Sequence, residues 1–134
     1  MRLIPVLVVA ALALAVTAAA PAAPAAPKKA LVTWRVAGET FRTYLRQSSD
    51  IGRVRQAIRE GRSAGIPIGR VVRGERENKG HRWHLANVRL ADVTIELCDG
   101  RPSYVDRKLG YWADVVGQFC PWSAVPVRLR WVSG

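Results

Sequence analysis

The distribution of apolar and polar residues divides the chain into a leader and one folded domain. Residues 3–16 are apolar apart from the helix-disfavouring Pro5, a run of the length of a signal-peptide core and too short to span a bilayer. Residues 21–27 repeat Pro-Ala-Ala, which favours an extended spacer. We predict a signal peptide at 1–25, a linker at 26–30 and a single basic domain at 31–134. A membrane anchor is the alternative interpretation of the apolar run.

Alternation of apolar and polar side chains is typical of strands with one buried face. It occurs at residues 31–36, 41–46 and 127–131, whereas residues 66–72 form an apolar, β-branched run around Pro67. Residues 93–98 also alternate, which predicts a central strand that ends at the turn dipeptide Asp99-Gly100.

Two helices are predicted between the strands. Apolar residues recur at helical spacing from Ile51 to Ile58, ahead of Gly61. A second helix should begin at Ser103 and end at Gly117. The simplest packing of these elements is an α+β domain with a mainly antiparallel sheet of about five strands and two helices.

Positive charge dominates the composition. The sequence has 21 Lys and Arg against 10 Asp and Glu, and without Arg2 the exported part carries about +10. Such an excess favours contact with nucleic acid, phosphate-rich polymers or acidic proteins. Arg55, Arg59 and Arg62 recur opposite the apolar stripe of the first predicted helix, so they are candidate anion-binding residues. A solvated helix face, with arginine reflecting a GC-rich genome, is the competing explanation.

The two cysteines, Cys98 and Cys120, both lie in the predicted exported part. In an oxidising compartment such a pair in a small domain normally forms a disulfide. Closing a loop of this size contributes about 3 kcal/mol in the chain-entropy account. The spacing matches no zinc or redox motif. We therefore predict one disulfide, with Trp122 packed over its sulfurs.

The sequence offers one cluster of acid, base and cation, which would suit a small secreted ribonuclease. It comprises Glu75, Glu77, His81, Arg82 and His84. On an extended segment, however, positions 81 and 84 face opposite sides. We therefore assign no catalytic residues and rank this activity lowest.

Metal and cofactor sites are not expected either. The two histidines lack an obvious third ligand for zinc, and four acidic residues lack the spacing of a calcium loop. These acids are Asp92, Glu96, Asp99 and Asp106. There is also no GxSxG nucleophile motif and no glycine-rich phosphate loop. We predict no metal ligands, no cofactor and no enzyme.

The leading prediction is a secreted, monomeric, non-enzymatic binding module without a transmembrane span in the mature chain. Its partner is unknown, with anionic polymers or acidic proteins as candidates. The main alternative is a small protease inhibitor that presents Arg101 in the loop at residues 99–103 beside the disulfide. Pro102 disfavours substrate-like engagement of that loop.

Several segments of the domain resemble a known family. They are Ile68–Gly74, Trp83–Leu85, Thr94–Gly100, Tyr104–Asp106 and Cys120–Ser123. Over residues 31–125 the chain resembles the secreted domains grouped with the N-terminal domain of the slime-mould protein BP seventy-four. The resemblance implies an extracellular module in which Cys98 pairs with Cys120, and it implies no reaction. A shorter connection before Cys120 and an arginine-rich tail after Trp122 depart from the family pattern.

Overall fold

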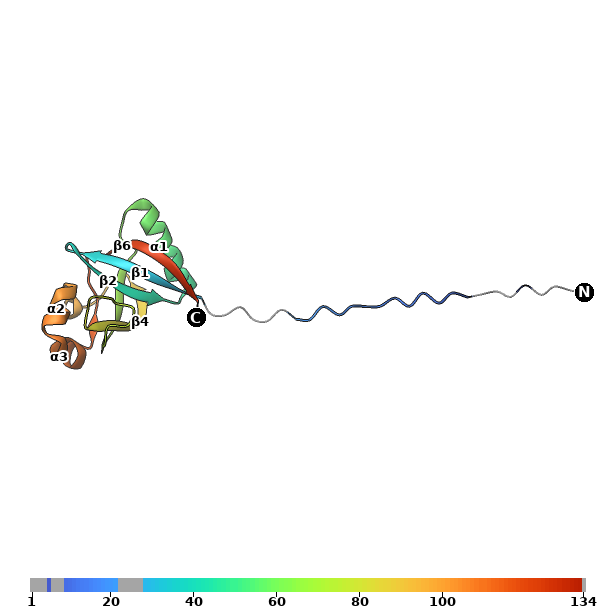
Figure 1. Ribbon diagram of the computed structural model, residues 1–134. Coiled ribbons are helices and arrows are strands. Elements are labelled where there is room, and N and C mark those ends of the chain that lie inside the picture. Colours follow the sequence, from blue (N-terminus) through green and yellow to red (C-terminus); the bar gives the residue numbers. More distant parts are fainter. Residues whose placement is uncertain (1–4, 6–8, 22–27, 134) are drawn as a thin grey trace, which may run out of the picture.

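The computed structural model describes residues 5, 9–21 and 28–133. Residues 9–21 contain no helix or strand, and the folded domain occupies 28–133 (Figure 1). The predicted end of the signal peptide at residue 25 and the first two residues of the predicted linker, 26 and 27, lie outside the described ranges, whereas residues 28–30 of that linker belong to a strand. Among the helices of the described ranges, none has the length and apolar character needed to cross a membrane.

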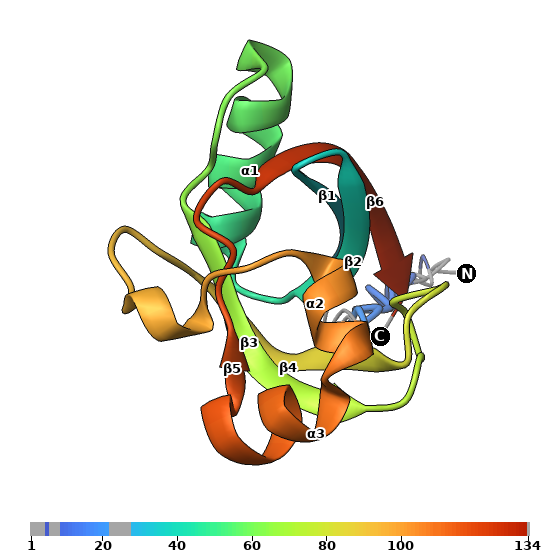
Figure 2. The ribbon, with the colours of Figure 1, turned by 90° about the vertical axis from the view of Figure 1, so that its left-hand side faces the viewer.

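Within residues 28–133, six strands form two antiparallel sheets of three strands each, and Figure 2 shows their arrangement. The first sheet has the order β2-β1-β6 and the second has the order β4-β3-β5. Their bounds are β1 Lys28–Val36, β2 Glu39–Leu45, β3 Ile66–Arg73, β4 Trp83–Ala91, β5 Gln118–Phe119 and β6 Val125–Ser133. The α+β class, the antiparallel pairing and the disulfide are therefore confirmed, whereas the single five-stranded sheet was wrong.

Strands β1 and β2 form a tight hairpin. Val36 pairs with Glu39, so the turn consists of Ala37 and Gly38 alone. Both residues have positive φ, 49° and 81°, as a type I′ turn requires. The hairpin is the local unit on which the first sheet is built.

Helix α1, Ser48–Glu60, connects the two sheets and buries one face that includes Ile51 and Val54. Gly61 adopts the left-handed conformation directly after it. The Arg62 N–H donates to the Ala57 carbonyl at 3.0 Å, which completes a Schellman cap. The helix thus ends where the sequence predicts, and Arg62 lies beyond it.

The predicted second helix is interrupted. Helix α2, Pro102–Arg107, ends at Lys108, where φ is −128° and ψ is 49°. Helix α3, Leu109–Tyr111, and a π-helical turn, η2 Trp112–Val116, follow before Gly117. In both ribbon views α2 and α3 lie at the opposite end of the domain from α1 (Figures 1 and 2).

The predicted central strand at residues 93–98 was wrong. These residues form a protruding loop that closes with a 3₁₀ turn, η1 Glu96–Cys98. Val93, Ile95 and Leu97 are 84%, 65% and 58% exposed, so their alternation marks no buried face. The second sheet contains β4 in place of the predicted strand. The alternation of side chains along β4 is broken at Asn87, where φ is 55°. The pairing of β4 with β3 shifts register near this residue.

Aromatic rings fill the space between the sheets. The Phe119 ring of β5 lies 5.4 Å from both the Phe41 ring of β2 and the Trp83 ring of β4, measured between centroids. Trp112 lies 5.7 Å from the same ring. These contacts are edge-to-face, a favourable arrangement for aromatic quadrupoles. Phe119 therefore sits where both sheets and the helical end of the domain meet.

The disulfide lies in a second, smaller cluster. Cys98 and Cys120 are buried together with Ile68 and Ala91, and their Cα atoms are 5.1 Å apart. The bond joins η1 to the end of β5, so it fastens the protruding loop to the second sheet. Trp122 is 44% exposed, which contradicts its predicted place in the packing around the sulfurs.

We predict that Phe119→Ala lowers the free energy of unfolding by about 3–5 kcal/mol, because it removes a ring that contacts both sheets. Tyr111→Ala removes an exposed ring and should cost less than about 1 kcal/mol. Denaturant unfolding of the two variants measures the difference. Equal losses would show that Phe119 is not central to the packing.

Candidate functional site

The outer face of the first sheet, opposite the aromatic core, carries a concentration of basic side chains. Val32 and Trp34 of β1 are fully buried, so the intervening Thr33 points outward by strand alternation. The register places Thr33 between Arg42 of β2 and Arg128 of β6. Strand pairing therefore brings together two arginines that are far apart in the sequence.

One step along the same face, Leu31 lies between two further outward residues. Tyr44 of β2 pairs with Leu31 on one side, and Arg130 of β6 pairs with it on the other. Lys29 lies at the start of β1, with its ammonium 4.1 Å from the centroid of the Tyr44 ring. The outer face of the sheet thus presents a continuous basic surface over three strands.

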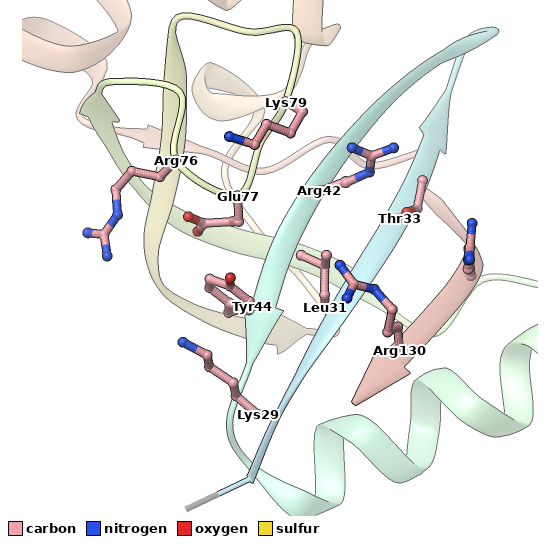
Figure 3. Close-up of a pocket in the computed structure, with 10 residues that line it drawn as sticks. Lys29, Leu31, Thr33, Arg42, Tyr44, Arg76, Glu77, Lys79 and Arg130 are labelled. Atoms are coloured by element: carbon pink, nitrogen blue, oxygen red, sulfur yellow. The ribbon is translucent and has the colours of Figure 1, made fainter. Parts of the chain in front are cut away.

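The loop between β3 and β4, residues 74–82, turns this surface into a groove of about 830 Å³ (Figure 3). The loop contributes Arg76, Glu77 and Lys79 to one wall. In all, the groove is lined by six cationic side chains: Lys29, Arg42, Arg76, Lys79, Arg128 and Arg130. Within the described ranges, no carboxylate forms an ion pair with any of the four arginines, and Lys79 pairs with Glu75 at 3.3 Å.

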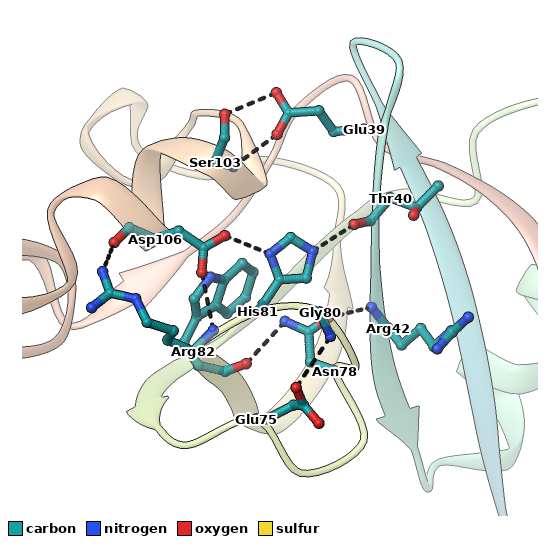
Figure 4. Close-up of polar contacts among 11 residues, drawn as sticks. Glu39, Thr40, Arg42, Glu75, Asn78, Gly80, His81, Arg82, Ser103 and Asp106 are labelled. Atoms are coloured by element: carbon teal, nitrogen blue, oxygen red, sulfur yellow. Dashed lines mark hydrogen bonds and ion pairs between the residues drawn. The ribbon is translucent and has the colours of Figure 1, made fainter.

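A buried amide attaches the loop to the sheet. The Asn78 side chain is fully buried. Its Oδ1 accepts the Arg42 N–H at 2.9 Å, and its Nδ2 donates to the Trp83 carbonyl at 3.0 Å (Figure 4). Asn78 therefore uses an edge N–H of β2 to hold the wall of the groove against the strands.

A histidine provides a second attachment. His81 Nδ1 lies 2.6 Å from Asp106 Oδ2, and its Nε2 lies 2.8 Å from the Thr40 carbonyl (Figure 4). Both neighbours are acceptors, so a ring nitrogen that carries a proton can donate to the neighbour it faces. Asp106 Oδ1 also accepts the Arg82 N–H at 3.0 Å. These contacts tie the loop to α2 and to β2.

The loop also contains an internal carboxylate. Glu75 accepts a hydrogen bond from the Gly80 N–H and pairs with Lys79. The Gly80 bond, followed by the Lys79 contact, holds the pKa of Glu75 below its ordinary value. The carboxylate is therefore ionised at neutral pH, and its support of the loop is lost only as the pH falls through this lowered pKa.

The two histidines do not meet in one site. His84 is buried, and its Nδ1 lies 2.8 Å from the Gly74 carbonyl. His81 faces Asp106 and Thr40 with its two ring nitrogens. The cluster considered for a ribonuclease thus supports the loop through hydrogen bonds, except for Glu77, which lines the groove. No cluster of three His, Cys, Asp or Glu side chains suited to a metal occurs within the described ranges.

The helix arginines singled out from the sequence lie elsewhere. Arg55 and Arg59 are on the exposed face of α1, and Arg62, which follows the helix, pairs with Glu60. None of the three lines the groove. Arg101 is exposed directly before α2, with its guanidinium 5.9 Å from the centroid of the Tyr104 ring, and Pro102 is buried at the start of that helix.

Sequence reasoning missed the groove residues because it weighed each segment alone. The outward direction of Arg128 and Arg130 follows from the alternation in their strand. Their position beside Arg42 does not, because it depends on the pairing of β1 with both β2 and β6. The contribution of Arg76 depends on the closure of a loop by residues from β2 and α2.

Comparison with known proteins identifies a domain family. A family model described as the BP seventy-four N-terminal domain matches residues 28–131. No curated protein and no solved structure matches the chain. The match covers β1 to β5 and β6 as far as Trp131, and it confirms the resemblance inferred from the motifs.

We predict that Asn78→Ala lowers the free energy of unfolding by about 2–3 kcal/mol, because it removes two buried hydrogen bonds. Hydrogen exchange at the Arg42 amide should accelerate by more than global unfolding explains. Gln47→Ala removes an exposed amide before α1 and is the matched control. Unchanged exchange at Arg42 would contradict the role of Asn78 in holding the loop.

Proposed function

This chain belongs to the BP seventy-four N-terminal domain family, and we propose that it is a secreted, non-enzymatic module that binds anionic polymers. The observation that carries the proposal is the convergence of six cationic side chains from three strands and one loop on a single groove. Its leader sequence and its disulfide support export, since disulfides persist in oxidising compartments.

The electrostatics of the groove favour an anionic ligand. Arg42 and Arg128 lie on the two strands that flank Thr33 of β1. Because neighbouring strands lie about 5 Å apart, these two cations are within about one Debye length of each other at physiological salt. Such like charges repel and cost stability in the empty domain. A ligand that brings several negative charges relieves this repulsion and gains from each cation.

The extent of the groove favours a polymer over a single small anion. A cavity of about 830 Å³ is larger than one phosphate or carboxylate group can fill. The cations come from β1, β2, β6 and the loop, so one anionic group contacts only a few of them at a time. A chain with repeating charges can engage them together and gain by multivalency.

The groove is also preorganised for binding. Arg42, Arg128 and Arg130 project from paired strands, and Asn78 and His81 hold the opposing loop. A ligand therefore does not have to order the backbone around it, which removes a major entropic cost of association.

We predict that the double variant Arg42→Ser/Arg130→Ser weakens binding of dextran sulfate about fivefold to tenfold, because it removes two groove cations. Its affinity should also depend less steeply on salt than that of the original protein. The matched control is Arg55→Ser/Arg59→Ser, which removes the same charge from α1. Titration of the labelled polymer at two salt concentrations measures both effects. Equal weakening by the control would show that net charge alone governs binding.

Arg76 allows a second test, because it holds a left-handed conformation with φ of 45°, which costs a non-glycine residue free energy. We predict that Arg76→Gly weakens binding of the same polymer while stability stays equal or rises by up to about 1 kcal/mol. Ala37→Gly relieves a similar backbone conformation in the β1–β2 turn and should leave binding unchanged. A loss of stability in Arg76→Gly would assign Arg76 a structural role instead.

A further inference from the structure

We propose that the groove selects acidic polysaccharides over polymers that carry only acceptor groups, and that Glu77 is the residue that recognises sugar hydroxyl groups. This inference rests on the proposed function, since it assigns a polymer class to the same groove. The observation behind it is an unpaired carboxylate among the cations.

Among the residues that the structure describes, Glu77 is the single acidic side chain that lines the groove. It is partly buried, and it extends from the loop into the groove (Figure 3). Throughout the described part of the chain, no ion pair or hydrogen bond to its carboxylate occurs. Glu75, two positions earlier, has the contrasting role, because Gly80 and Lys79 occupy its carboxylate.

A free carboxylate weakens a site that binds bare anions. It cancels part of the positive charge, and it repels phosphate or sulfate groups that approach it. An ionised carboxylate can only accept hydrogen bonds. The groove is therefore complementary to a ligand that brings hydrogen-bond donors together with its negative charges.

Acidic polysaccharides meet both requirements. Their uronate or sulfate groups can pair with the arginines, and their free hydroxyl groups can donate to Glu77. The hydroxyl groups of Thr33 and Tyr44 line the same groove and can donate or accept. Polyphosphate lacks internal hydroxyl groups, so it would leave the Glu77 carboxylate desolvated beside anionic oxygens.

Single-stranded nucleic acid fits the groove less well. Proteins that bind such strands without sequence preference stack the bases on aromatic side chains. In the described part of the chain, Tyr44 is the one aromatic residue that lines the groove, and Lys29 covers a face of its ring at 4.1 Å. The groove thus offers charge and hydrogen bonding without a series of stacking platforms.

The test compares alginate, which is a hydroxyl-bearing uronate polymer, with inorganic polyphosphate and single-stranded DNA, all matched in total charge. We expect the original protein to bind alginate most tightly. In Glu77→Gln the affinity for polyphosphate should rise, and the ratio of alginate to polyphosphate affinity should fall about fivefold, because a charge-assisted hydrogen bond is lost. The matched control is Glu96→Gln, which makes the same charge change at an exposed residue of η1.

The outcomes separate the two proposals. A ratio that Glu77→Gln leaves unchanged, or a protein that prefers polyphosphate or DNA to alginate, overturns the selectivity. After either result, the proposed function still stands if Arg42→Ser/Arg130→Ser weakens the affinity for whichever of the three polymers the original protein binds most tightly. No binding of any of the polymers overturns the proposed function itself. A ratio that falls in Glu77→Gln and not in Glu96→Gln supports the assignment of Glu77.

Discussion

The contact of Phe119 with Phe41 and Trp83 joins the two halves of this domain. The two sheets are separate in their strand pairing, so side-chain packing between them determines how they are placed. Phe119 reaches both sheets from the short strand β5 and also contacts Trp112 beside α3. Burial of these rings in an edge-to-face arrangement is a strong apolar interaction. The rest of the architecture follows from which strand faces this packing buries.

Strand alternation then determines which side chains lie on the outer face of the first sheet. Once Val32 and Trp34 face the aromatic core, Leu31 and Thr33 must face outward. The pairing registers then decide which cations flank them. His81, which belongs to the cluster considered for a ribonuclease, serves this surface indirectly, because its contact with Asp106 holds the loop that forms the wall of the groove. These two side chains form hydrogen bonds that support the structure of the loop.

Local patterns were sufficient for part of the fold. The β1–β2 hairpin, helix α1 with its glycine cap, and the pairing of Cys98 with Cys120 were all predictable from the sequence. The alternation at residues 93–98 led to the wrong prediction of a strand, because a period of two residues does not show whether other parts of the chain cover one face. The groove was not predictable, because Arg42 and Arg128 meet only through the register of β1 with two partners. Arg55, Arg59 and Arg62 were favoured as anion-binding residues instead, because their helical spacing is visible within one segment of the sequence.

The first and last strands of the domain, β1 and β6, are paired along most of their length, from Lys28 with Ser133 to Arg35 with Val125. Arg128 and Arg130 therefore reach the groove only after the final strand has docked beside the first. If the groove binds a polymer as proposed, that polymer would contact both strands and oppose their separation. The proposed ligand would thus stabilise the domain against opening from its ends, and the groove is complete only when β6 has paired with β1.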